Sequence, residues 1–362
     1  MVTASSFSLD WRGILLSVGS VGEDWPNKVR DEVSSELNKI FGRDFLIAFF
    51  VPALFFLLGT FFLLGLFSVD TPLSHLNWRR PLEDTSFLVI VALIFAIFLQ
   101  AVNREIFRMA EGYWPERLRR RLNGFHRSRF RKLTDKVNEL YNQEGEIDEQ
   151  KFNALSLRAA MKYPSTEAQV LPTSFGNAVR AYEDYPRAIY GFESINGWSR
   201  LQALISPEFR DVLSQDRARV DLWLNLSFLA CVFGLELAIF ASYFGRYSSL
   251  WIELPLLFLI WFAYVRARSS VQEYGDQVKA AFDVYLPALA ITLGYTLSSD
   301  VDKNRKFWSA FSEVMIYRDE AALRDMANSG LKTIPNSEEA GEDLTTGLGS
   351  SLYCACLMTT RP

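Results

Sequence analysis

The chain has 362 residues and a net charge of −4; 14% of the residues are aromatic, and 29 are phenylalanine. Three cysteines and two histidines are too few for a disulfide scaffold or a histidine-based metal or catalytic centre, and no glycine-rich phosphate loop occurs. The sequence therefore predicts no enzyme, no catalytic residue, no cofactor and no metal site. Its aromatic surplus is gathered in a few apolar runs, which favours an all-α membrane protein with a helical cytoplasmic domain.

Residues 1–44 are mostly polar and show no pattern of a cleavable signal peptide. Trp25, Val29, Val33 and Leu37 recur every four residues, which predicts an amphipathic helix in this N-terminal segment. The helix either lies flat on the membrane surface before the first span or packs against the cytoplasmic domain.

Four apolar runs are long enough to cross a membrane. The first has 25 residues without a charge. At about 1.5 Å per residue, such a helix exceeds the hydrocarbon core of roughly 30 Å. Tryptophan and tyrosine near the ends of the last two runs suit the headgroup level. The runs are residues 45–69 and 86–102, which form the predicted hairpin 45–102, and residues 222–244 and 250–265, which form the predicted hairpin 222–265.

Lysine and arginine are distributed unevenly between the segments that join these runs. Residues 104–136 contain eleven of them. The loop between the first two runs has Arg79 and Arg80, and the loop between the last two has Arg246. The positive-inside rule therefore predicts that both termini and the middle segment are cytoplasmic.

Several signals predict helices in the cytoplasmic parts. The sequence Ser-Pro-Glu from Ser206 is a strong helix start, and no breaker follows before Gly234. One helix of nearly forty residues is therefore expected to run from the cytoplasm through the third span. Pro186 and Pro287 are expected to end the helices in which they occur. The predicted parts are a helical domain, C-terminal helices and a mobile acidic tail, at residues 103–221, 266–327 and 328–362.

The stretch 104–136 interleaves its basic residues with aromatic and leucine side chains. Three interpretations remain open: a surface for anionic lipid, a site for nucleotide or oligonucleotide phosphates, or a topogenic signal with a solvated face. Further along, Arg180 and Arg200 either bind a ligand or make structural salt links. The ligand- or lipid-binding candidates are Arg119, Arg120, Arg121, Arg127, Arg129, Arg131, Lys132, Arg180 and Arg200.

The third run contains polar residues that are costly in hydrocarbon. Glu236 lies within it, Asn225 is eleven residues earlier, and Asp221 is one turn before Asn225. Because eleven residues are nearly three helical turns, the three side chains form one polar stripe. They either line a water-filled path in an oligomer or make polar contacts inside a closed bundle. Close helix approach is expected at three glycines, Gly59, Gly65 and Gly234.

The sequence Leu-Pro-Thr-x-x-Gly-Asn-x-x-Arg-Ala-x-Glu from Leu171, together with Tyr190-Gly191, Trp198-x-Arg200 and Ala280-Ala-Phe-Asp, resembles a family of largely uncharacterised bacterial membrane proteins with four spans. The architecture also resembles the membrane effector of the Hailong anti-phage system. This resemblance implies a location in the bacterial inner membrane and an ion-conducting oligomer that a nucleotide-derived signal releases. It transfers no functional residue to this chain.

Two hypotheses follow. In the first, the chain forms a homotetrameric channel that its cytoplasmic domain gates in anti-phage defence, with Asp221, Asn225 and Glu236 along the path. Its partners would be membrane lipids, copies of itself, and a nucleotide, an oligonucleotide or a protein in the cytoplasm. In the second, the chain is a non-conducting anchor or scaffold that recruits a cytoplasmic partner through residues 103–221.

Overall fold

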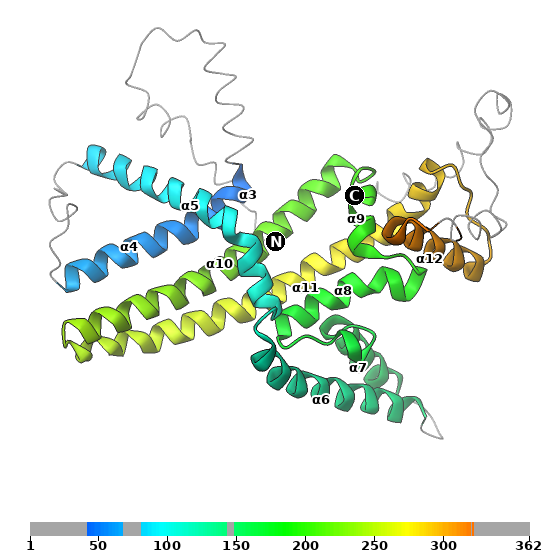
Figure 1. Ribbon diagram of the computed structural model, residues 1–362, viewed down its shortest axis with the longest axis horizontal. Coiled ribbons are helices and arrows are strands. Elements are labelled where there is room, and N and C mark those ends of the chain that lie inside the picture. The colour runs from blue at the N-terminus through cyan, green and yellow to red at the C-terminus, as the bar shows by residue number, and fades with distance from the viewer. Residues whose placement is uncertain (1–41, 68–80, 143–147, 320, 322–362) are drawn as a thin grey trace, which may run out of the picture. The chain divides into compact units, whose positions relative to one another are not determined.

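Figure 1 shows the computed structural model, which describes residues 42–67, 81–142, 148–319 and 321. These residues are almost entirely helical and contain no β-strand, which confirms the predicted all-α class for this part of the chain. The predicted N-terminal amphipathic helix and the predicted acidic tail lie outside the described residues.

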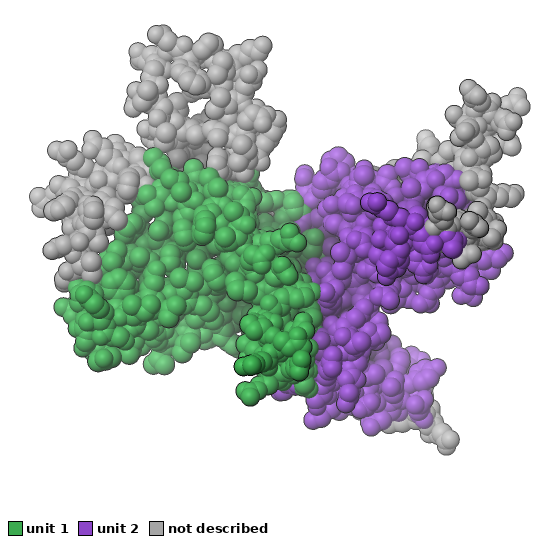
Figure 2. All heavy atoms as spheres, viewed as in Figure 1, with its two compact units in different colours: residues 1–124, 171–176, 214–274 green, residues 125–170, 177–213, 275–362 purple. Residues whose placement is uncertain are grey.

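The chain divides into two compact units, coloured separately in Figure 2. The predicted segments 103–221 and 266–327 each contribute residues to both units. Unit 1 comprises residues 1–124, 171–176 and 214–274, and unit 2 comprises residues 125–170, 177–213 and 275–362.

The first hairpin of unit 1 contains a distorted turn near its beginning. Its elements are α3 (Arg43–Phe45), the π-helix η1 (Leu46–Phe50), α4 (Val51–Leu66) and α5 (Pro81–Glu111). Pro52 is the second residue of α4. Because proline has no backbone N–H, it cannot donate to the carbonyl of Ala48 four residues earlier, and the wider π-helical turn occurs where that bond is missing.

The second hairpin of unit 1 pairs α10 (Pro207–Tyr243) with α11 (Glu253–Thr292), and the short 3₁₀ helix η4 (Tyr247–Ile252) joins them. The hydroxyl of Ser206 accepts a hydrogen bond from the amide of Phe209 at 3.3 Å, as the predicted cap requires. At 37 residues, α10 confirms the prediction of one helix of nearly forty. Figure 1 shows α10 and α11 side by side, and the hydroxyl of Ser227 donates to the carbonyl of Ile260.

Four helices in the described residues are long and apolar enough to cross a membrane, as predicted. They cover Arg43–Leu66, Leu88–Glu111, Pro207–Tyr243 and Tyr247–Thr292. The last two extend well beyond the hydrophobic runs, so each combines an apolar half with a polar half.

Two of the three predicted glycine contacts are present within unit 1. A Cβ atom on Gly59 would lie 3.1 Å from the ring of Phe233, and one on Gly234 would lie 3.1 Å from a carboxylate oxygen of Glu253. A Cβ on Gly65 would meet no described atom within 4 Å, so the prediction is wrong there as far as the described residues extend. Small residues therefore bring α4 and α11 close to α10 at two levels.

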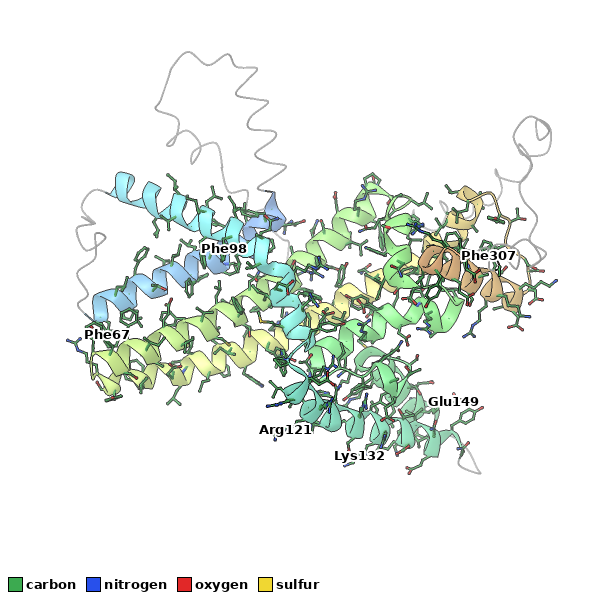
Figure 3. All side chains as sticks on the ribbon, in the orientation of Figure 1. Phe67, Phe98, Arg121, Lys132, Glu149 and Phe307 are labelled. Carbon is green, nitrogen blue, oxygen red and sulfur yellow. The ribbon has the colours of Figure 1, made fainter. Side chains whose placement is uncertain are left out.

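Unit 2 is built on short helices and an aromatic core. Trp308 and Phe307 are almost fully buried, and the ring of Phe192 lies 5.2 Å from Trp308 and 5.8 Å from Phe282. Figure 3 labels Phe307 on α12 (Val301–Tyr317). The helix that carries Phe307 lies within residues 266–327, where C-terminal helices were predicted. The helices that contribute are α6 (Glu116–Tyr141), α7 (Glu149–Lys162), the 3₁₀ helix η3 (Glu167–Gln169), α8 (Ser174–Tyr190), α9 (Ser194–Gln202) and α12 (Val301–Tyr317).

The prediction that two prolines end helices is wrong. Pro186 lies inside α8, which continues to Tyr190, and Pro287 lies inside α11, which continues to Thr292. Each proline removes one backbone hydrogen bond, but the packing of the apolar faces on either side maintains the helix. Leu286 and Leu289, which flank Pro287, are both buried.

Candidate functional site

Asn225 is fully buried and bonded to the distorted turn of the first hairpin. Its side-chain amide donates to the carbonyl of Ala48 at 2.9 Å. That carbonyl is the one that Pro52 cannot satisfy. In a membrane no water replaces a missing backbone bond, so a polar side chain on a neighbouring helix commonly supplies it. The hydrogen bond to Ala48 therefore gives Asn225 a structural role in the third span that does not require a path for ions.

Pro52 and Asn225 should be energetically coupled. Replacing Asn225 by leucine in the wild-type chain leaves the Ala48 carbonyl without its side-chain donor, which should cost about 1–3 kcal/mol. The same replacement should cost less after Pro52→Ala, because alanine restores a backbone donor. A double-mutant cycle on thermal unfolding in detergent measures the difference, expected at about 1 kcal/mol. Additive effects would show that the two residues act independently.

Asp221 lies one turn before Asn225, at the end of a charged cluster. Its carboxylate accepts from Nε of Arg217 at 3.2 Å, and the Arg217 guanidinium lies 4.1 Å from the ring centre of Phe107 on α5. Asn103 lies one turn before Phe107 on α5, and Asp221 lies one turn after Arg217 on α10. One carboxylate oxygen of Asp221 and the amide oxygens of Asn103 and Asn225 are buried without a hydrogen-bond partner among the described residues. Buried polar groups of this kind commonly bind internal water.

Glu236 completes the predicted stripe toward the other end of the span. The hydroxyl of Thr60 on α4 donates to its carboxylate at 3.0 Å. Asn225 and Glu236 therefore both contact the first hairpin, at two levels along it. Glu236 is only partly buried, in contrast to Asn225. The three residues of the stripe lie on one helix, but of the three only Glu236 is partly exposed.

The basic candidates separate into paired and unpaired residues. Arg131 makes two hydrogen bonds to the Glu167 carboxylate, at 2.8 and 2.6 Å, and these contacts raise the pKa of Arg131 and lower that of Glu167. Arg119 and Arg120 both contact Glu116, whose pKa falls chiefly because of Arg120. The remaining candidates on α6 are exposed and make no ion pair with any described residue: Arg121, Arg127, Arg129 and Lys132.

The two candidates outside α6 make local contacts. Arg180 forms an ion pair with Glu183 at 3.0 Å, and Arg200 donates to the carbonyl of Asn196 at 2.9 Å. Both contacts stay within one helix, which favours the interpretation of structural links. The described residues contain no group of three His, Cys, Asp or Glu side chains that could hold a metal ion.

Sequence reasoning missed one polar cluster in unit 2. The hydroxyls of Tyr185 and Tyr190 both donate to the Asp283 carboxylate, at 3.0 and 2.7 Å. Burial, followed by the hydrogen bond to Asp283, raises the pKa of both tyrosines. Tyr190 and Asp283 lie in motifs that carry the family resemblance, but no spacing rule relates positions 93 residues apart. The contact fastens the end of α8 to the polar half of α11.

His126 is buried on the inner side of α6, and its Nδ1 has no hydrogen-bond partner among the described residues. Burial, and to a lesser degree the positive charge of Arg129, lower its pKa. Between this lowered value and the ordinary value of about 6.5, the unfolded chain binds the proton more readily than the folded protein does. The free energy of unfolding should therefore fall as the pH drops through that window.

Replacing His126 by leucine should flatten this pH dependence. The melting temperature of the wild-type protein should fall between pH 7.5 and about 5.5, and that of the variant should fall less. Differential scanning fluorimetry in detergent measures both, and His75→Gln, which changes the other histidine, is the control. Parallel curves for wild type and His126→Leu would contradict the expectation.

Comparison with protein-family models, curated proteins and solved structures found no match for this chain.

Proposed function

We propose that this chain is a subunit of a homo-oligomeric membrane channel. The observation that carries the proposal is the Glu236 carboxylate, which lies partly exposed in an apolar span and has Thr60 as its one hydrogen-bond partner among the described residues. A carboxylate facing acyl chains costs a few kcal/mol, and such groups normally face a bundle interior or water. A second copy of the chain, or water held between copies, would remove that cost.

In a single copy, the fourth candidate span exposes apolar surface that can contact either acyl chains or another copy of the chain. Only 11% of its most apolar window is buried, compared with 39% for the third. Leu254, Phe258 and Trp261 are 71%, 63% and 59% exposed. One four-span protomer is too small to enclose a pore, so a channel requires a closed ring of copies. We propose four copies, with the carboxylates of Glu236 facing a shared path.

The resemblance to anti-phage effectors extends the proposal. The channel would lie in the bacterial inner membrane with both termini in the cytoplasm, and a nucleotide-derived signal would open it. The polar halves of α10 and α11 continue directly from the candidate spans, so a movement of the cytoplasmic residues could reach the membrane without a flexible joint.

A non-conducting anchor or scaffold is the second candidate. The contacts of Asn225 favour it, because that residue is satisfied within the protomer and needs no pore to explain it. In an anchor, Thr60 and Glu236 would form one more contact that fastens α4 to α10.

The number of copies of the chain in a lipid disc distinguishes the channel from the anchor. The full chain is reconstituted at low density into nanodiscs large enough for several copies, and its mass is measured by native mass spectrometry. A closed oligomer, expected to contain four copies, supports the channel. A single copy per disc would favour the anchor.

A further inference from the structure

Three buried polar side chains of unit 1 each keep an oxygen without a hydrogen-bond partner. Asn103, Asp221 and Asn225 are 9%, 6% and 0% exposed. One carboxylate oxygen of Asp221 and the amide oxygen of each asparagine are bonded to no described residue. Leaving a buried acceptor without a partner is costly, so each of these oxygens calls for a ligand. We call the three oxygens the acceptor group.

The residues around the acceptor group belong to one packed cluster that joins the first hairpin to α10. Asn103 lies between two members of this cluster on one face of α5, because residues three and four apart share a face. Asp221 and Asn225 lie between two other members on one face of α10. Ala48, whose carbonyl accepts from Asn225, is also a member. The flanking members are Leu99, Ile106, Ala218 and Leu229.

Counting along the first hairpin places Asn103 at the level of Ala48. The rings of Phe56 on α4 and Phe95 on α5 stack with their centres 5.3 Å apart. Ala48 is eight residues before Phe56 and Asn103 is eight residues after Phe95, so both lie about 12 Å along the hairpin from that stack. In agreement, α5 packs against η1, which contains Ala48. Asn103 therefore lies at the level of the residue to which Asn225 is bonded.

Counting along α10 places Asn103 at the level of Asp221 as well. The first helix of the hairpin and α10 run in the same direction, because one hydrogen bond joins their earlier residues and another joins their later residues. The second helix, α5, therefore runs opposite to α10. The Arg217 guanidinium lies 4.1 Å from the ring centre of Phe107. One turn from this contact leads back to Asn103 on α5 and forward to Asp221 on α10. Both counts thus place the acceptor group at one level between the same helices.

The chemistry of the acceptor group suits a monovalent cation. A water molecule donates only two hydrogens, whereas a cation attracts all three oxygens. Carboxylate and amide oxygens are ligands for hard cations. The Asp221 carboxylate is the one negative charge in the group, and Arg217 already shares it at 3.2 Å. Ca²⁺ and Mg²⁺ sites usually hold more carboxylate charge, so an ion with a single charge is favoured.

The backbone beside the acceptor group is irregular. The π-helical turn η1 contains Ala48. Turns of this type are frequent at functional sites, and irregular backbone within membrane helices is commonly found where it lines an ion site or a cavity. This observation is independent of the three side chains and also indicates a bound ion.

We infer that Asn103, Asp221 and Asn225 form a binding site for Na⁺ inside one protomer. The three oxygens contact the ion, and internal water completes its coordination. The ion joins α5 of the first hairpin to α10 of the second. The site lies within the protomer, so it is compatible with both the channel and the anchor, and its test does not depend on conduction.

The test compares the melting temperature of the full chain in detergent, in NaCl and in N-methyl-D-glucamine chloride of equal ionic strength. An ion that binds only the folded protein stabilises it, so Na⁺ at roughly ten times its Kd should raise the melting temperature by about 2–4 °C. Asn103→Leu should abolish this rise. The substitution should be tolerated, because the amide oxygen that it removes is bonded to no described residue.

Two further variants are matched to each other. Asp221 and Asp216 are both buried carboxylates on α10, and each pairs with an arginine within one turn. Asp216 lies about 140° or more around the helix from Asp221 and Asn225. Asp221→Asn should remove the effect of Na⁺, and Asp216→Asn should retain it. Equal melting temperatures of the wild type in the two salts would show that the acceptor group holds water only and would overturn the inference. An undiminished effect of Na⁺ on Asn103→Leu would overturn it as well.

Discussion

Replacing Glu236 by glutamine should lower the single-channel conductance for monovalent cations about tenfold. A unit charge about 10 Å from an ion changes the energy of that ion by roughly 1.5–2 kcal/mol at an effective dielectric constant of 20, and 1.4 kcal/mol corresponds to a factor of ten. Glutamine keeps an oxygen that can accept the hydrogen bond from Thr60, so the fold should be preserved. Recordings of the reconstituted protein in planar bilayers measure the effect.

Glu253→Gln is the matched control. Glu253 is also a carboxylate in unit 1, but it belongs to α11 and lies against Gly234 rather than against α4. Its neutralisation should change the conductance much less. Equal conductance of wild type and Glu236→Gln would show that this residue does not line the path. If folded wild-type protein in the bilayer gave no current at all, the anchor would be favoured.

Replacing Gly176 by alanine should destabilise unit 1 by about 1–3 kcal/mol or more. A Cβ atom there would overlap the backbone carbonyl of Glu111, which cannot rotate away as a side chain could. Hydrogen bonds hold the same region together: the Gly176 amide donates to the hydroxyl of Thr173 at 2.9 Å, and that hydroxyl donates to the carbonyl of Ala110 at 2.7 Å. The beginning of α8 is thereby fastened to the end of α5.

Gly124→Ala is the matched control for that substitution. Gly124 lies within α6, and a Cβ atom there would meet nothing within 4 Å. Alanine is the better helix former, so this variant should be stabilised by about 0.5–1 kcal/mol. Thermal unfolding in detergent, followed by tryptophan fluorescence, compares both variants with wild type. A Gly176→Ala protein as stable as wild type would show that the close contact is not required.

The spans were predictable because burial in hydrocarbon leaves a long and simple pattern. Residues 45–69 carry no charge, and the cap at Ser206 with no later breaker predicted α10 almost to its full length. These features depend on residues that are close together in the sequence, so they can be recognised without the structure.

Features that depend on contacts between distant residues were not predictable. Pro186 and Pro287 were expected to end helices, but packing on both sides of each proline maintains them. Asn225 was expected to belong to a polar stripe. Its hydrogen bond to the carbonyl of Ala48, which Pro52 leaves without a backbone donor, could not be predicted, because the bond depends on how two helices pack whose bonded residues are 177 positions apart. The tyrosine pair on Asp283 likewise has no signature in the sequence.

The most direct test of the channel is whether water reaches residue 236 in the membrane. In a chain whose three native cysteines are replaced by alanine, Glu236→Cys and the lipid-facing control Ile239→Cys are treated with a charged, membrane-impermeant thiol reagent, and Tyr247→Cys near the end of the hairpin reports that the reagent is active. We expect modification at positions 236 and 247 and none at 239. Modification at 247 alone would show that no aqueous path reaches the carboxylate, which would contradict the proposed channel.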